Sequence, residues 1–158
     1  MRQSVKTGLS FGLTSGVITT LGLLVGLNAG THSRVAVIGG IVTIAVADAL
    51  SDAMGIHLAE ESKNSGSELE IWEATIATFA AKFVIAMSFA VPIVLLPLDQ
   101  AVLASVGWGL CLLALLSYGL ARAQRIAPWR VIAEHGVIAL FVVVATHYLG
   151  EWLRAVLQ

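Results

Sequence analysis

The chain has 158 residues, of which 58% are hydrophobic and only 12% are charged, and its mean hydropathy is +0.89. Soluble domains carry about 25% charged residues, so this composition predicts an integral, multi-pass protein of a cell membrane. The net charge of −1 and the scattered basic residues argue against a nucleic-acid partner. The single cysteine, Cys111, excludes a disulfide framework and a cysteine-rich metal site.

Apolar stretches predict the spans in chain order. A hydrocarbon core about 30 Å thick requires roughly 20 apolar residues as helix. Alternating polar and apolar residues, the pattern of a membrane β-barrel, are missing. The predicted fold is an all-α integral membrane protein, a five-transmembrane-helix bundle forming a single domain over 1–158. The expected spans are about 8–29, 34–58, 73–97, 100–121 and 131–153, with Pro92 and Pro97 kinking and ending the third.

The loop charges predict an orientation. Basic residues prefer the cytoplasmic side, and a cytoplasmic N-terminus leaves only Arg34 and Arg154 outside. Five spans cannot form two equal halves, so transporter-like symmetry would require a second copy, and we expect a homodimer. The residues placed on the cytoplasmic side are Arg2, Lys6, Lys63, Arg122, Arg125 and Arg130.

Glycines recur at four-residue spacing in the first span. Small residues at this spacing let helix backbones approach closely in lipid, which predicts tight helix packing. Ser15 and Thr19 lie near one helical face with Gly22 and Gly26, so this face could also be narrow, polar and close to a partner. The two glycine runs are Gly8, Gly12, Gly16 and Gly22, Gly26, Gly30.

Two aspartates stand one helical turn apart in the second span, within the segment "VADALSDAMGIHLAEES". A charge at mid-membrane costs at least about 2.5–3.5 kcal/mol, so such carboxylates face a bundle interior or a wet cavity. Asp48 and Asp52 point the same way, about 6 Å apart along the helix axis, and repel each other. A cation is therefore expected beside them. The candidates are Lys82, near the middle of the third span, and a divalent metal ion such as Mn²⁺ or Fe²⁺.

Acidic residues gather around the connection between the second and third spans. They could form an acidic mouth that concentrates cations at the cytoplasmic end, or they could simply be polar helix ends. Met54, His57, Glu60 and Glu61 continue the second span, while Glu68, Glu70 and Glu73 begin the third. His147, within the last span, is expected to be a hydrogen-bonded histidine of the bundle core.

Two segments, "GLTSGVITTLGLLVGL" and "ADALSDAMG", resemble the vacuolar iron transporter family. That family's first span typically reads G-L-N-D-G-L-V-S-T-F-G-L and its second carries A-G-A-L-S-M-A-x-G-E. The resemblance implies five spans, a dimer with the ion path between subunits, and export of Fe²⁺ or Mn²⁺ from the cytosol in exchange for protons.

The chain departs from this family at its ligand positions. The first-span aspartate falls on Ser15, the second-span methionine on Asp52, and the glutamate after the glycine on Ile56. Asp48 stands where a small residue is usual, and the family's cytoplasmic metal-binding insert is reduced to "EESKNSGSELE". These departures indicate a divergent, minimal relative whose carboxylates have moved to the second span.

The leading functional hypothesis is a proton-coupled Fe²⁺ or Mn²⁺ transporter with no resident cofactor. In it, Asp48 and Asp52 bind the ion, and Ser15 and Thr19 line the opposing wall. The expected metal-binding residues also include Glu60, Glu61 and Glu73, and the transport path adds Met54, His57 and Lys82. The alternative is a non-transporting membrane protein with a buried Asp/Lys structural network. An enzyme is not expected, although "GLTSG" comes near the G-x-S-G motif of intramembrane proteases.

Overall fold

The computed structural model describes residues 2–63 and 67–157, and these residues form helices and no strands. Five helical stretches are long and apolar enough to cross a membrane, which confirms the all-α class and agrees with the number of apolar helices that the sequence predicts. The third stretch is divided in two. The helices are α1 (Gln3–Thr31), α2 (Arg34–Glu61), α3 (Glu68–Ser88), α4 (Ala90–Leu95), α5 (Leu98–Gln124) and α6 (Pro128–Leu157).

Polar caps mark the starts of two helices, and one of them begins before its predicted apolar stretch. α3 begins at Glu68, five residues before the predicted span, since Ser67 and Glu70 form a capping box. Ser33 likewise accepts a hydrogen bond from the Ala36 N–H at the start of α2. α1 ends in His32, whose φ of 46° is the left-handed conformation that reverses the chain within two residues.

The third span breaks where its proline predicts. Pro92 lies in α4 and cannot donate to the carbonyl of Ser88, the residue four positions earlier and the last of α3. Arg34 then ties the end of this span to α2, because its guanidinium donates to the carbonyl oxygens of Val94 at 3.3 Å and Leu96 at 2.7 Å. Pro97 precedes α5, so both prolines act as expected.

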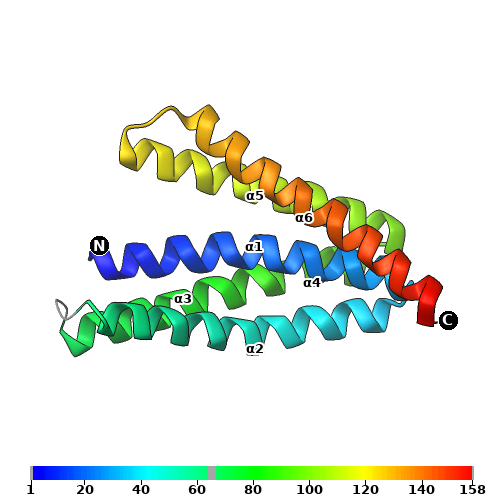
Figure 1. Ribbon diagram of the computed structural model, residues 1–158, viewed down its shortest axis with the longest axis horizontal. Helices are drawn as coiled ribbons and strands as arrows, with labels where there is room; N and C mark the ends of the chain where they lie inside the picture. The colour runs from blue at the N-terminus through cyan, green and yellow to red at the C-terminus, as the bar shows by residue number, and fades with distance from the viewer. Residues whose placement is uncertain (1, 64–66, 158) are drawn as a thin grey trace.

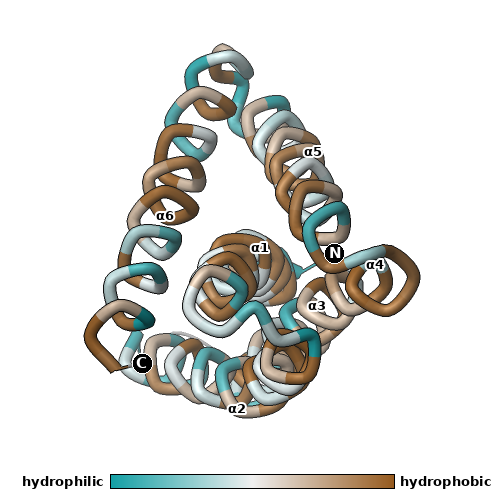
Figure 2. The backbone as a smooth tube through the Cα atoms, turned by 90° about the vertical axis from the view of Figure 1, so that its right-hand side faces the viewer, coloured by the Kyte–Doolittle hydropathy of each residue, from teal (hydrophilic) through white to brown (hydrophobic). Residues whose placement is uncertain are grey.

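α1 is the central helix, and the other helices surround it (Figure 2). The N-terminus, the α2–α3 connection and the α5–α6 turn lie at one end of the bundle, which we call the N-terminal end (Figure 1). The six basic residues that the charge pattern grouped together all belong to this end. α1 contacts α2, α3, α5 and α6 directly, so it forms the axis of the fold.

Glycines allow this central position, as the four-residue spacing predicts. A β-carbon built at Gly12 would lie 2.5 Å from the Thr78 carbonyl oxygen of α3, and one at Gly22 would lie 2.8 Å from Val142 of α6. No side chain fits at such distances. The N-terminal half of α1 therefore packs closely on α3, and its C-terminal half packs on α6.

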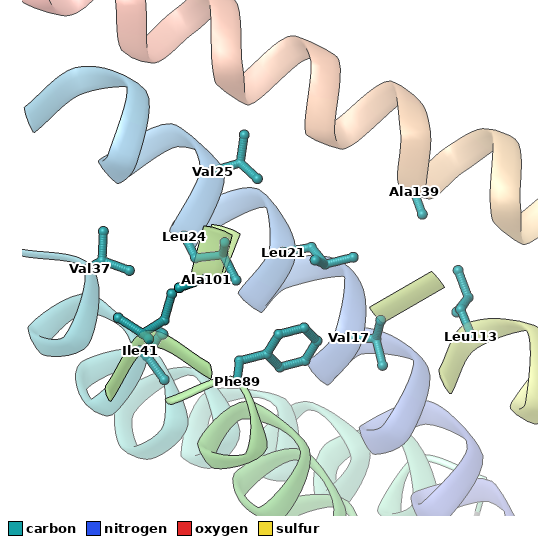
Figure 3. Packing of buried hydrophobic residues seen from close by; sticks show 11 residues of the cluster. Val17, Leu21, Leu24, Val25, Val37, Ile41, Phe89, Ala101, Leu113 and Ala139 are labelled. Carbon is teal, nitrogen blue, oxygen red and sulfur yellow. The ribbon is translucent and has the colours of Figure 1, made fainter. Parts of the chain in front are cut away.

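The hydrophobic core forms around the middle of α1. Val17, Leu21 and Leu24 are completely buried, and α2, α4, α5 and α6 each add one or two residues to the cluster (Figure 3). Phe89, at the break between α3 and α4, fills the space beside them. The outer residues are Val37 and Ile41 of α2, Ile93 of α4, Ala101 and Leu113 of α5, and Ala139 of α6.

Candidate functional site

Lys82 is the only charged side chain that is fully buried in the described part of the chain, with 1% of it exposed. Its ammonium nitrogen lies 2.5 Å from Asp48 Oδ2 and forms a second ion pair with Asp52 Oδ2. The ion-pair partner that the sequence predicted for the two aspartates is therefore present. Their contact with the same nitrogen also confirms that Asp48 and Asp52 point the same way.

Ser15 completes this cluster from α1. Its hydroxyl accepts a hydrogen bond from Lys82 Nζ at 3.0 Å and donates one to Asp52 Oδ2 at 2.7 Å. The three helices α1, α2 and α3 thus each supply polar side chains to one point. We call Ser15, Asp48, Asp52 and Lys82 the central polar cluster.

The central polar cluster lies at the middle depth of the bundle. Ser15, Asp48 and Lys82 each fall close to the midpoint of their own span. One ammonium against two carboxylates leaves a formal charge of −1. The two carboxylates thus carry one more charge than Lys82 balances, and an uncompensated charge is expensive in an apolar interior.

The two carboxylates are not fully enclosed by the chain. The side chain of Asp48 is 32% exposed and that of Asp52 is 20% exposed, in contrast to Lys82. Asp48 stands at the edge of an open groove of about 460 Å³ between α1 and α2. Apart from Asp48, the groove is lined by Leu23, Leu27, Ala36, Gly40, Thr43, Ile44 and Ala47.

A polar cavity of about 320 Å³ lies at the N-terminal end, between α1, α2 and α3. Glu60 and Glu70 line it together with Lys63 and Ser4. Because a water molecule occupies about 30 Å³ in the liquid, the cavity has room for a hydrated ion. The three helices that surround this cavity are the same three that supply the central polar cluster.

Polar side chains lie between this cavity and the central polar cluster. His57 Nδ1 is 3.0 Å from Thr75 Oγ1, and the His57 ring meets Trp72 edge-on at 4.8 Å. One turn further along α3, Thr78 is completely buried and bonds to its own helix at Ala74 O. Sequence reasoning missed Thr75 and Thr78, although these residues stand seven and four positions before Lys82, a spacing that places all three on one face of α3.

The predicted acidic residues do not converge on the aspartates. Glu60 pairs with Lys63 at 2.6 Å, Glu73 pairs with Arg2 at 2.8 Å, and Glu61 is exposed. No group of three or more metal-binding side chains forms anywhere in 2–63 or 67–157. Within one chain, Asp48 and Asp52 therefore stand apart from the three glutamates.

The structure places three predicted residues away from their expected surroundings. They are Thr19, Met54 and His147. Met54 is half exposed on the outward face of α2, because it is two residues from Asp52 and so points to the other side of the helix. The Thr19 hydroxyl donates to the Ser15 carbonyl of its own helix. His147 is half exposed, 3.5 Å from Glu151, so its expected place in the core is wrong.

The predicted polar face of α1 is also divided between two neighbours. Ser15 meets α2 and α3, whereas Gly22 and Gly26 pack against Val142 and Thr146 of α6. The two parts face different helices because α3 lies along the N-terminal half of α1 and α6 crosses its C-terminal half. Only the Ser15 part belongs to the central polar cluster.

Comparisons of the chain with protein-family models and with curated proteins find no match.

Proposed function

We propose that this protein is a divalent-cation transporter that carries Fe²⁺ or Mn²⁺ and exchanges it for protons. The observation that supports it most directly is the central polar cluster, in which one buried ammonium holds two carboxylates at the middle of the membrane span. Carboxylate and hydroxyl oxygens suit hard and borderline divalent ions. The motif resemblance to vacuolar iron transporters favours these two ions as substrates.

In this proposal the Lys82 ammonium occupies the ion-binding position whenever no transported ion is bound. A divalent ion that binds Asp48 and Asp52 displaces Lys82, and the ammonium returns to the carboxylates when the ion leaves. This exchange keeps the carboxylates paired with a cation throughout the cycle. Ser15 remains as a neutral oxygen ligand on the α1 side.

The polar cavity at the N-terminal end serves as the entrance. Lys63 neutralises Glu60 in the lining, so Glu70 leaves one net negative charge that attracts cations from the cytosol, with the exposed Glu61 nearby on α2. His57, Thr75 and Thr78 offer polar contacts on the way to Lys82. With the N-terminus in the cytoplasm, the direction of transport is export.

The proposal includes a homodimer joined along α2. A carboxylate 32% exposed at mid-membrane would face lipid in a monomer, and this is unfavourable by several kcal/mol. The outward face of α2 carries small residues every four positions, which favour close contact with another helix. This small-residue row consists of Gly39, Thr43, Ala47, Ser51, Gly55 and Ala59, all exposed.

A non-transporting protein with a structural Asp/Lys network is the other candidate. It is supported by the complete burial of Lys82 and by the hydrogen bond from Ser15 to Asp52. This role predicts that Asp52→Asn chiefly lowers stability, whereas transport predicts loss of flux from an intact dimer. An intramembrane protease has less support, because Ser15 donates its hydroxyl hydrogen to Asp52 and not to a histidine.

Metal flux into proteoliposomes tests the proposal. We expect wild type to carry Fe²⁺ and Mn²⁺ under an imposed pH gradient, with less flux of Ca²⁺. The flux through the double variant Asp48→Asn/Asp52→Asn should be at least about tenfold lower than through wild type, a difference that corresponds to about 1.4 kcal/mol. Size-exclusion chromatography and circular dichroism establish whether the variant remains a folded dimer.

Asp99→Asn is the matched control, since Asp99 is an exposed carboxylate in the first turn of α5. This variant should keep the full flux. Absence of flux for every ion in wild type would overturn the transport proposal. Flux that persists in the double variant would show that the ion binds elsewhere.

A further inference from the structure

The α5–α6 turn concentrates positive charge at the N-terminal end of the bundle. Arg122, Arg125 and Arg130 lie within nine residues that contain no acidic residue, and we call this segment, 122–130, the basic turn. All three arginines are exposed. None of them forms a salt bridge with a carboxylate of the described residues, so their charges are available to an external partner.

Helix-end stability does not account for two of these arginines. Arg125 has a φ of 58°, and the Ile126 N–H bonds to Ala121 O, a helix-ending motif in which glycine is the favoured residue. Arg130 lies in the first turn of α6, where the helix dipole favours acidic side chains and repels cations. A local structural role would select other residue types at both positions.

Apolar side chains accompany the charges. Ile126 and Trp129 are exposed on the same turn, and the Arg130 guanidinium carbon lies 5.4 Å from the centre of the Trp129 ring. Tryptophan and arginine together are typical of the interface between a bilayer and water. Along the hairpin, Leu115 and Phe141 are also exposed, so an apolar surface continues from the turn toward the membrane interior.

Five acidic residues of this end lie on other helices, whereas Glu134 lies on α6 itself, exposed and four residues after Arg130. Glu60, Glu61, Glu68, Glu70 and Glu73 belong to α2 and α3, and the α5–α6 turn stands apart from that connection, with α1 between them (Figure 1). The glutamates of α2 and α3 are therefore separated from the basic turn. Glu134 forms no salt bridge with the three arginines in the described residues, and together with them it leaves a net formal charge of +2 for an approaching anion.

We propose that the basic turn binds the headgroup of an anionic phospholipid. The phosphate contacts Arg122, Arg125 and Arg130, and the acyl chains lie along the exposed apolar residues of α5 and α6. Basic residues at a helix end and an apolar surface directly behind them match the two parts of such a lipid. A soluble anion would use only the charges, and this is why the lipid is the favoured occupant.

Tryptophan quenching by brominated lipids tests this inference independently of transport. The full-length chain carrying Trp72→Phe, Trp108→Phe and Trp152→Phe keeps Trp129 as its single tryptophan. It is reconstituted in phosphatidylcholine bilayers with the same small fraction of either brominated phosphatidylglycerol or brominated phosphatidylcholine. We expect an enrichment of phosphatidylglycerol around Trp129 of about fivefold, and we expect added salt to reduce it.

Arg122→Gln/Arg125→Gln/Arg130→Gln should abolish the enrichment, whereas Lys6→Gln, also exposed at this end, should retain it. A chain that keeps only Trp152, at the opposite end of the bundle, should show equal quenching by both lipids. Equal quenching of Trp129 in the wild-type arginine background would overturn the proposal without any arginine variant. Enrichment that survives in the triple variant would also overturn it.

Discussion

Lys82 determines how the charges at the centre of the bundle are balanced. It is the one cation in contact with Asp48 and Asp52, and it is fully buried. Removing one partner of a buried ion pair is strongly destabilising, because the charge that remains has no counter-ion. The two functional alternatives therefore differ in one respect. In a transport site a divalent cation can take the place of the Lys82 charge, whereas in a structural network it cannot.

We predict that Lys82→Met lowers the free energy of unfolding by about 3–5 kcal/mol when a chelator is present. If the aspartates form a cation site, Mn²⁺ should restore much of this loss and raise the Tm of the variant more than that of wild type. Thermal unfolding in detergent, with and without Mn²⁺, measures both effects. Lys6→Met, at an exposed position, is the control, and an Mn²⁺ response no larger than that of this control would favour a purely structural network.

The sequence was sufficient to name Lys82 as one of two candidate cations for the aspartates, the other being a divalent metal ion, because four-residue spacing and mid-span depth constrain charges strongly in an apolar bundle. It could not place Met54 or His147. Which side of a helix is buried depends on the neighbouring helices, and in a lipid-facing helix apolar residues occur on both sides. The hydrogen bond between Ser15 and Asp52 could not be predicted either, because it depends on how closely α1 and α2 approach each other.

At the scale of the helices, α1 depends on close contact with its neighbours. Its glycines meet the backbone of α3, and even one extra carbon at Gly12 would lie 2.5 Å from a carbonyl oxygen. A backbone atom cannot move aside as a flexible side chain can. The packing of α1 against α3 also holds Ser15 within 3.0 Å of Lys82.

We predict that Gly12→Ala lowers the free energy of unfolding by about 1–3 kcal/mol, because the added methyl group overpacks the α1–α3 contact. Gly119→Ala is the matched control, since a β-carbon at this exposed position of α5 meets nothing within 4 Å. Chemical denaturation of both variants in mixed micelles measures the difference. Equal stability of the two variants would contradict this account of the glycine spacing.

The number of helices and their order followed from hydropathy, and the break in the third span followed from Pro92. The boundaries were less accurate, by five residues at the start of α1 and of α3. The reason is that hydropathy detects the part of a helix that lies in lipid, whereas capping decides where the helix ends. Ser67 and Glu70 form a Ser-x-x-Glu pattern that could have moved the predicted start of α3 to Glu68.

For the whole molecule, the outward face of α2 is one surface that a single chain leaves unpartnered, and it is distinguished by its small residues. A β-carbon at Gly39 or Gly55 meets nothing within 4 Å, unlike one at Gly12 or Gly22 of α1. Val46, Leu50 and Met54 stand beside the small-residue row and are exposed. Two such faces can interlock, with large residues of one α2 beside small residues of the other.

We predict that Ser51→Cys, introduced into a Cys111→Ala background, forms a disulfide-linked dimer in membranes under mild oxidation. Ser51 lies in the middle of the small-residue row, so the two copies should bring this position together across a twofold axis. Leu103→Cys, on the exposed face of α5, is the control and should remain monomeric on a non-reducing gel. Cross-linking of Leu103→Cys but not of Ser51→Cys would place the interface on another helix.

The central position of α1 has a consequence for how the protein is made. α1 is synthesised before its neighbours α2, α3, α5 and α6, which all follow it along the chain. The hydrogen bond between Lys82 and Ser15 can form only after residue 82 has been translated. If the five apolar helices span a membrane, the glycines and hydroxyls of a newly made α1 face lipid at first, and each later helix covers a further part of them.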